Sequence, residues 1–314
     1  MSKKRITFKG IIKVFKNSFS GFSNDKIMKL SGSLAYSTLF SIGPLLIVII
    51  SLCSLFLGRD AIEGQIYRQL VDFVGDDTAK QLQQIIKNAS LSGKSTTAAV
   101  VGGVVLLVGA TAIFSEIQDS INQIWGIKPK PQKGWLQFLK NRVLSFSIIV
   151  SLGFLLLVSL GVNTILDAFN HRLQNIFPDV AVAIFYVINM IITFVVTSLI
   201  FAVIFKVLPD AAIKWRDVKT GAFATAILFM FGKAAISFYI SKSNVGSTYG
   251  AAGSLVILLV WVYYSSIILY FGAEFTKAYA SEYASSIHPN AYSVTTKTVE
   301  VEKGKESVQQ NTNS

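Results

Sequence analysis

Long stretches without charged side chains dominate this sequence and limit the folds that it can adopt. A helix needs about 20 mostly apolar residues to cross the ~30 Å hydrocarbon core of a bilayer. Six stretches reach that length, although the fifth contains one charged residue, Lys233. We expect an all-α, polytopic membrane protein with six transmembrane helices. The predicted spans are residues 34–57, 96–115, 143–166, 180–205, 220–240 and 251–273.

The composition supports a membrane protein. Charged residues make up 15% of the chain, against about 25% in an ordinary soluble domain. The first span begins late and no small-residue cleavage site follows it, so we expect a retained signal anchor. The single cysteine, Cys53, cannot form an intrachain disulfide. The two histidines, His171 and His288, are far apart, so a zinc site of the usual kind is not expected.

Lysine and arginine are distributed unevenly around the spans, and this distribution predicts the orientation. Of the 29 Lys and Arg residues, 21 lie before the first span, in the loops 116–142 and 206–219, and after residue 274. Cytoplasmic flanks carry the excess of such residues, so both termini are predicted to be cytoplasmic. The same bias accounts for the net charge of +12, and no nucleic-acid partner is expected.

The segments outside the spans divide the chain further. In residues 1–29, apolar residues recur at helical spacing between lysines, which is typical of a basic amphipathic helix on anionic lipid; a partner-binding role is the alternative. In the outer loop 59–94, two amphipathic helices separated at Gly75-Asp76-Asp77 would form a lid or a gate. Residues 30–287 are the predicted membrane domain, and the polar tail 288–314 is predicted to be disordered.

Lys233 is the candidate functional residue that stands out. A lysine at the centre of a spanning helix costs about 2.5–3.5 kcal/mol on insertion scales, so it usually faces protein or water. Small residues such as Ala222 and Ala226 share its side of the predicted helix, whereas Ile227, Phe231 and Phe238 lie on the opposite side. That pattern favours an inward role in function or structure. Snorkelling of the lysine towards the outer headgroups is the alternative.

The first span contains Gly43-Pro44 and is therefore expected to kink, because proline removes the hydrogen bond to the Phe40 carbonyl. Its cytoplasmic half is rich in hydroxyl groups, including that of Tyr36. Two explanations remain open. The polar half lines a cavity that faces the cytoplasm, or its hydroxyl groups satisfy the carbonyls near the kink.

Other polar residues occur in or beside the spans. Asn189, Thr193 and Thr197 follow one another at i, i+4 spacing and are expected to bond between helices. Tyr249 and Gly250 begin a small-residue surface for close packing at the sixth span. Glu116 and Glu274 lie at predicted cytoplasmic helix ends, where a carboxylate can stay hydrated. The last candidates, Asp119 and Asn122, belong to the segment 115–125, which continues the second helix into the inner interface.

Motifs for enzymatic chemistry are missing from the sequence. It has no phosphate-binding glycine loop with Lys-Ser/Thr, no HExxH and no clustered aspartates, and no histidine lies at mid-membrane depth. We therefore expect neither an enzyme nor an ATP-driven pump, and no metal or other cofactor.

Several blocks of sequence resemble the YihY/BrkB family of bacterial inner-membrane proteins, over residues 20–285. They are LAYSTLFSIGPL at 34–45, the segment 116–125, LPD at 208–210, WRDV at 215–218, Gly232-Lys233, YGAAGS at 249–254 leading to Trp261, and Gly272-Ala273-Glu274. The resemblance implies six helices in the bacterial inner membrane. The family was formerly labelled ribonuclease BN, and some members are described as transporters of lipid-like or anionic material.

The hypothesis is a transporter that does not use ATP, or a lipid- or anion-translocating protein of the cell envelope. In it, Lys233 engages an anionic group in a cavity lined by the kinked first helix, and membrane lipids surround the protein. A scaffold that organises envelope assembly without transport is the alternative. Without a metal cluster or an acid–base pair, ribonuclease activity is not expected. The substrate, the direction, the energy source and the oligomeric state are left open.

Overall fold

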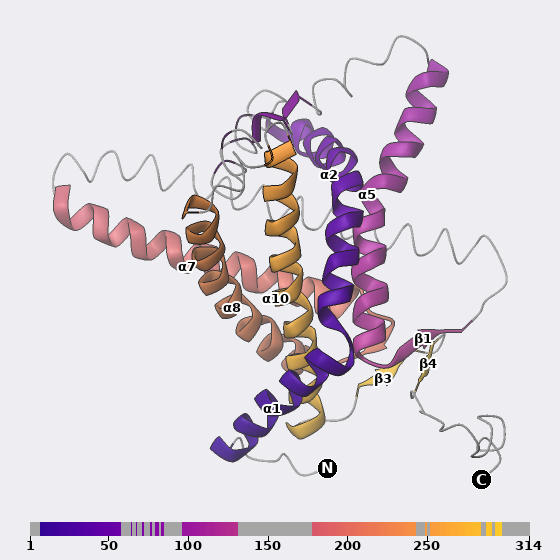
Figure 1. Cartoon of the computed structure of the whole chain (residues 1–314), viewed down its shortest axis with the longest axis vertical. Helices are drawn as coiled ribbons and strands as arrows, with labels where there is room; N and C mark the ends of the chain where they lie inside the picture. The colour runs from indigo at the N-terminus through magenta and orange to yellow at the C-terminus, as the bar shows by residue number, and fades with distance from the viewer. Residues whose placement is uncertain are drawn as a thin grey trace.

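The computed structural model of the chain is a set of long helices with a small strand region at one end (Figure 1). It describes residues 7–57, 96–130, 178–242, 252–283, 287–290 and 293–296, with Tyr249 and single residues between 64 and 84. The helices are α1 Phe8–Asn24, α2 Ile27–Leu57, α5 Thr96–Ile124, α7 Pro178–Val207, α8 Trp215–Lys242 and α10 Gly253–Tyr283. Five of them contain predicted spans, and the predicted span 143–166 lies outside the described residues.

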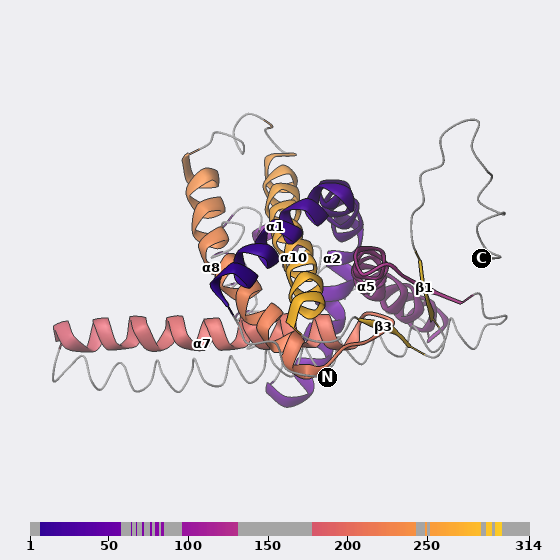
Figure 2. The same ribbon diagram turned by 90° about the horizontal axis from the view of Figure 1, so that it is seen from below.

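Three helices in the described part of the chain are long and apolar enough to cross a membrane. These segments are Val187–Val207, Trp215–Ile236 and Leu255–Tyr283. Figure 2 shows α7 extending sideways beyond the other helices, with only its later part beside α8. Accordingly, Met190, Ile191, Val195 and Leu199 of α7 are exposed within the described part.

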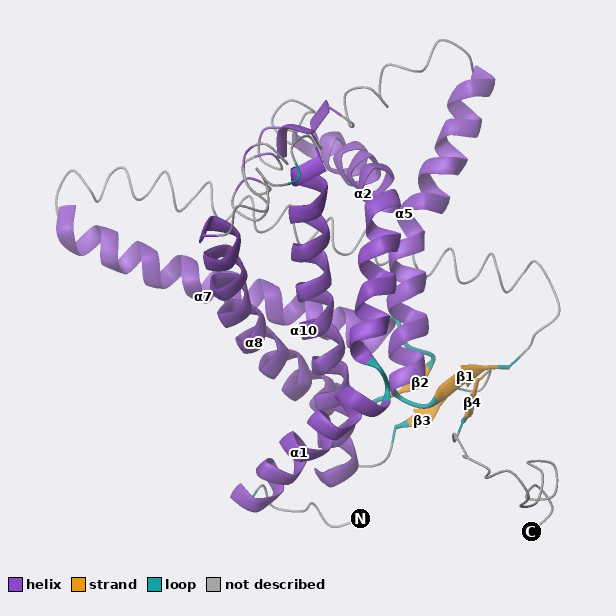
Figure 3. Cartoon of the chain, in the orientation of Figure 1, coloured by secondary structure: helices purple, strands orange, loops and turns teal. Residues whose placement is uncertain are grey.

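Within the described residues, four short strands lie at one end of the helices, and we call this the strand end (Figure 3). Strand β1, Ile127–Pro129, pairs antiparallel with β4, Ser293–Thr295. Strand β2, Ala211–Ala212, pairs antiparallel with β3, His288–Pro289. The fold is therefore mainly helical rather than strictly all-α.

The prediction that residues 288–314 are disordered is wrong at their beginning, because β3 and β4 fall within them. Backbone contacts hold this stretch: the Asn290 amide donates to the Asp210 carbonyl at 3.0 Å, and the Thr296 amide donates to the Gly126 carbonyl at 2.8 Å. Backbone pairing of this kind leaves no apolar periodicity in the sequence. Residues 297–314 lie outside the described residues.

Helix α10 lies in the middle of the bundle and packs against α1, α2, α8 and α5 (Figure 1). Its contact with α8 depends on glycines. A Cβ atom at Gly221 of α8 would collide with Thr276 of α10, and a Cβ atom at Gly272 of α10 would collide with Thr225 of α8. The two backbones approach closely at these places because no side chain separates them.

Helix α2 continues through Pro44 and changes direction part-way along its length (Figure 1). Pro44 packs against α5, where a Cβ atom at Gly109 would lie 2.9 Å from its ring. The hydroxyl of Thr38 donates to the Leu34 carbonyl at 2.7 Å, so it does not satisfy the carbonyl that the proline frees. Gly43 is buried, and Tyr36 is exposed with its ring 5.1 Å from Phe40.

The predicted outer lid 59–94 is described only at single residues, which are helical. Asp76 accepts hydrogen bonds from the Tyr67 hydroxyl and the Lys80 ammonium. The remainder of this loop lies outside the described residues.

Candidate functional site

A pocket of about 270 Å³ lies between α7 and α8. Polar and apolar side chains share its wall. Its lining residues are Asn189, Met190, Thr193 and Thr197 from α7, and Phe229, Met230 and Lys233 from α8. Two predicted site residues, Lys233 and Asn189, thus line one cavity although they are 44 positions apart in the sequence.

The pocket is polar along α7 because of its i, i+4 stripe. The Thr193 hydroxyl donates to Asn189 Oδ1 at 3.4 Å, and Thr197 follows one turn later. Both Asn189 and Thr193 are exposed, so this wall reaches the surface of the described part. Hydroxyl and amide groups facing a lysine can hold an anion through several hydrogen bonds.

The side of α8 that carries the lysine is set by packing. Ala222 and Ala226 are buried, whereas Phe231 on the opposite side is 75% exposed. Phe229 stands edge-to-face with Phe201 of α7 at 5.7 Å and with Trp261 of α10 at 6.2 Å. These ring contacts fix the wall beside Lys233, which is half-buried.

The predicted cavity between Lys233 and the kinked first helix is not the pocket observed. Helices α7 and α8 line the observed pocket, and Tyr36, Gly43 and Pro44 lie elsewhere, on α2. The hydroxyl-rich half of α2 instead packs inward: Thr38 and Ser41 are buried. Tyr249 is exposed at the far end of the bundle, and Gly250 lies outside the described residues.

A buried polar network at the strand end is built around Asp210. Its carboxylate accepts hydrogen bonds from Gln118 Nε2 at 3.2 Å and from Asn122 Nδ2 at 2.9 Å. Its amide donates back to Asn122 Oδ1 at 2.9 Å, and its carbonyl accepts from the Ser293 hydroxyl at 2.8 Å. Because Gln118 and Asn122 belong to α5 and Ser293 to β4, this network joins α5, the α7–α8 connection and the C-terminal strands.

Asp119 lies beside this network on α5. Partial burial and the negative charges of Glu116 and Asp210 raise the pKa of Asp119 above its ordinary value. Glu116 is half-buried one turn earlier. Asn122, by contrast, has a clear structural role through Asp210.

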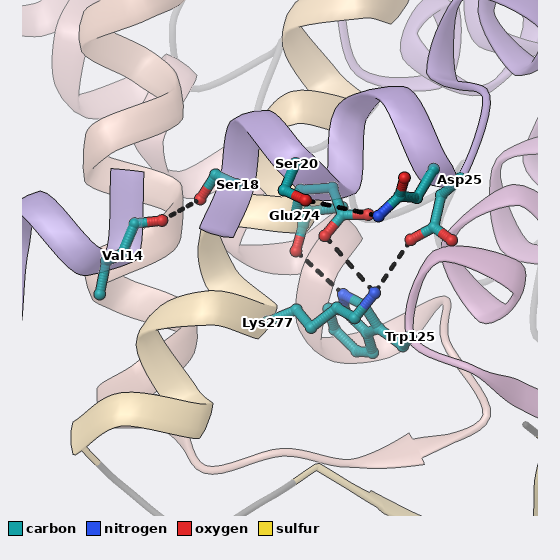
Figure 4. A network of polar contacts seen from close by, with 9 residues as sticks. Val14, Ser18, Ser20, Asp25, Trp125, Glu274 and Lys277 are labelled. Atoms are coloured by element: carbon teal, nitrogen blue, oxygen red, sulfur yellow. Dashed lines mark hydrogen bonds and ion pairs between the residues drawn. The ribbon is translucent and has the colours of Figure 1, made fainter. Parts of the chain in front are cut away.

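A second polar cluster joins α1, the turn that follows it and α10 (Figure 4). The Glu274 side chain of α10 is 2% exposed, so the prediction that it stays hydrated at a helix end is wrong. It is covered by α1, where a Cβ atom at Gly21 would lie 2.5 Å from Glu274 Oε2. Lys277 Nζ lies 3.5 Å from Glu274 Oε2 and donates to Asp25 Oδ2 at 2.9 Å.

The turn between α1 and α2 places Asp25 in this cluster. The Asp25 amide donates to the Gly21 carbonyl at 2.8 Å, and Lys26 turns the chain with a positive φ of 54°. Burial raises the pKa of Asp25, but the neighbouring Glu274 carboxyl group and the hydrogen bond from Lys277 outweigh it, so this pKa is lower than usual. At neutral pH Asp25 is therefore ionised.

Sequence reasoning missed Asp25, Lys277, Gln118 and Asp210. Asp210 stood in a family-like block, but nothing in the sequence pairs it with Asn122, 88 residues earlier. Likewise Asp25 and Lys277 are 252 residues apart. Within the described residues, no group of three His, Cys, Asp or Glu side chains is placed to hold a metal ion.

Comparison with known proteins places these features in a family. A sequence model of the family described as Virulence factor BrkB matches residues 18–294. A UPF0761 membrane protein of Vibrio campbellii is 28% identical over 278 residues, which cover 86% of this chain and 82% of that protein. A UPF0761 membrane protein of Psychromonas ingrahamii is 29% identical over 294 residues, which cover 88% of this chain and 89% of that protein. No solved structure matches.

Proposed function

Because the chain belongs to the Virulence factor BrkB family of membrane proteins, we propose that it is an inner-membrane transporter that does not use ATP. Its substrate is an anionic, lipid-like molecule. The observation that carries this proposal is the pocket between α7 and α8, which combines Lys233 with the polar stripe of α7 and with apolar side chains. The cationic and hydrogen-bonding groups suit an acidic headgroup, and Met190, Phe229 and Met230 suit the hydrocarbon next to it.

The size and the position of the pocket favour a headgroup over a whole lipid. At about 270 Å³, it falls below the roughly 300–1,000 Å³ typical of pockets that enclose a drug-sized ligand. Its exposed α7 wall continues into exposed apolar residues of the same helix, including Ile191 and Val195. An amphipathic substrate can therefore enter from the side, with its acyl chains in the bilayer.

The proposed topology has six spans with both termini in the cytoplasm. The described helices support alternating directions: α2 and α8 begin at the strand end, and α5, α7 and α10 finish there (Figure 1). The lysine- and arginine-rich flanks are at the same end, which favours the cytoplasmic side for the strand end. Chemical labelling of a cysteine introduced at position 130 tests this orientation, and labelling from outside would overturn it.

Helix α1 is proposed to lie on the inner leaflet of the membrane. It packs on α10 through Gly10 and Val14, while Phe8 and Ile12 are exposed on another side. Lys9 and Lys16 lie on a third side at helical spacing. An exposed apolar face beside a basic face matches the two requirements of a helix in an anionic headgroup layer.

The experiment for transport uses proteoliposomes that contain purified protein and a panel of fluorescent anionic and zwitterionic lipids or small anions. Movement across the bilayer is compared between wild type and Lys233→Ala. We expect wild type to move an anionic lipid and the variant to lose that movement at equal protein content. Lys242→Ala is the matched control, because Lys242 lies on the same helix, is exposed and does not line the pocket.

The alternative, a scaffold for envelope assembly, gives a different outcome. In that case no substrate moves in wild type, and Lys233→Ala changes nothing but the yield of folded protein. Equal loss of movement in Lys233→Ala and Lys242→Ala would also contradict a specific role for the pocket.

A further inference from the structure

A buried carboxyl group with an unpaired oxygen lies in the cluster that joins α1, the turn that follows it and α10. The Glu274 side chain is 2% exposed, and its Oε1 has no hydrogen-bond partner among the described residues. Its other oxygen, Oε2, faces Lys277 at 3.5 Å. An unpartnered buried oxygen is unfavourable unless something binds it, because burial removes the water that would otherwise do so.

The charges in this cluster do not balance when every group is ionised. Asp25 and Glu274 contribute two negative charges, and Lys277 contributes one positive charge. Lys277 lies closer to Asp25, at 2.9 Å, than to Glu274. The unmatched negative charge therefore falls on the more deeply buried carboxyl group, where an uncompensated charge is most unfavourable.

Among the described residues, the remaining charged neighbours do not supply the missing positive charge. Asp25 and Lys277 are the charged groups that act on Glu274. On the side of α5, Glu116 and Asp119 act on Tyr270, which lies one turn before Glu274, and both are acidic. Lys13 of α1 pairs with Glu282, two turns further along α10, at 2.7 Å.

We propose that Glu274 is a reversible proton-binding site, which takes up one proton on its carboxylate from the aqueous phase and shares it with the carboxyl group of Asp25. Uptake converts a cluster with one net negative charge into a neutral one, and no other bond forms or breaks. This site is separate from the Lys233 pocket, so it stands or falls independently of the proposed transport.

The location of the site gives protonation a structural consequence. The α1 backbone at Gly21 lies directly over Glu274, and Asp25 belongs to the turn that leads from α1 into α2. Loss of the proton leaves a negative charge enclosed between these segments and α10. Deprotonation thus weakens the contact of α1 with α10, and protonation strengthens it.

The experiment is infrared difference spectroscopy of the full chain in lipid nanodiscs during a pH titration. We expect a C=O stretch of a protonated carboxyl group that shifts in D2O, is absent in Glu274→Gln and persists in Glu282→Gln. The last variant is the matched control, since Glu282 lies on the same helix and is paired with Lys13. Size-exclusion chromatography checks that the near-isosteric variants are folded.

Two further variants keep the test decisive if Glu274→Gln does not fold. Asp25→Asn removes a negative neighbour and should lower the midpoint of the titration, and Lys277→Met removes a positive neighbour and should raise it, each by about one pH unit. The proposal is overturned if no such band exists or if the band survives Glu274→Gln. It is overturned as well if Asp25→Asn and Lys277→Met shift the midpoint of the titration in the same direction. It is also overturned if sodium ions, at constant pH, displace the proton and bind there instead.

Discussion

Helix α8 has one contact face that is tightly closed and another that is hollowed. Towards α10, Gly221 and Gly272 let Thr276 and Thr225 approach the opposite backbone. Towards α7, the same helix borders a pocket that contains Lys233. The two faces are built from adjacent residues of one helix: Gly232 packs against Ile268 and Tyr264 of α10, and Lys233 lines the pocket.

The hydrogen bonds of the two faces differ in the same way. On the α10 side, the Thr225 hydroxyl donates to the Gly221 carbonyl and the Thr276 hydroxyl to the Gly272 carbonyl, both at 2.7 Å. Each threonine thus satisfies its hydroxyl on its own helix, and its hydroxyl oxygen is the side-chain atom that lies nearest to the glycine opposite. On the α7 side, the polar groups of Asn189 and Thr193 remain at the exposed wall. One face is closed by side-chain contacts, and the other forms the wall of the pocket.

The largest expected effect comes from filling the closed face. In Gly221→Val, the new side chain collides with Thr276, so the protein should be destabilised by about 3 kcal/mol. Thermal unfolding in detergent, followed by tryptophan fluorescence and size-exclusion chromatography, measures this loss. Gly32→Ala is the control, because a Cβ atom there lies 4.0 Å from its nearest neighbour, Tyr263, and alanine favours a helix. If both variants unfold alike, the face is not closely packed.

A paired substitution should partly reverse that loss and sharpen the assignment. Gly221→Ala alone introduces a smaller clash with Thr276, and Thr276→Ala removes the hydroxyl and the methyl group that stand in its way. The double variant is expected to recover about 1 kcal/mol relative to the sum of the single changes. A double-mutant cycle from the same unfolding experiment measures the coupling. Purely additive effects would place the clash elsewhere.

On the hollow face, the effect should appear in activity and not in stability. Lys233→Ala is expected to reduce transport at least tenfold, which corresponds to about 1.4 kcal/mol of lost interaction with an anionic group. Its thermal unfolding should stay close to that of wild type, because a partly exposed pocket leaves no tightly packed cavity to collapse. The proteoliposome assay and the unfolding assay, run on one preparation, measure both. Large destabilisation would show that this lysine is structural.

The smallest expected effect is at the polar stripe of α7. Thr193→Val keeps the shape and removes a hydroxyl, so transport should fall roughly threefold, equivalent to about 0.6 kcal/mol for one neutral hydrogen bond. Thr220→Val is the matched control, since the Thr220 hydroxyl donates to the Arg216 carbonyl away from the pocket. If Thr193→Val and Thr220→Val reduce transport equally, the polar stripe of α7 does not contribute to substrate binding.

The sequence predicted several residues of the candidate site, but it did not predict which helix lies opposite Lys233. The charge-free stretches indicated the helices, and the small residues beside Lys233 indicated which side of α8 packs inward. The i, i+4 stripe of Asn189 and Thr193 was also visible. What failed was the choice of the helix opposite the lysine: Tyr36 and Pro44 were expected there, whereas α7 supplies that wall.

The sequence by itself determined the helices of the described residues, their apolar character and the family, because these depend on local composition and spacing. Only the tertiary structure decided which side chains meet. Asp210 bonds with Asn122 and Asp25 with Lys277, while Lys233 and Asn189 line one pocket, and the members of each pair come from segments far apart in the chain. Glu274 shows the physical reason: a carboxyl group at a helix end is hydrated or buried according to what packs over it, and here α1 covers it. Periodicity along one helix carries no information about that covering segment.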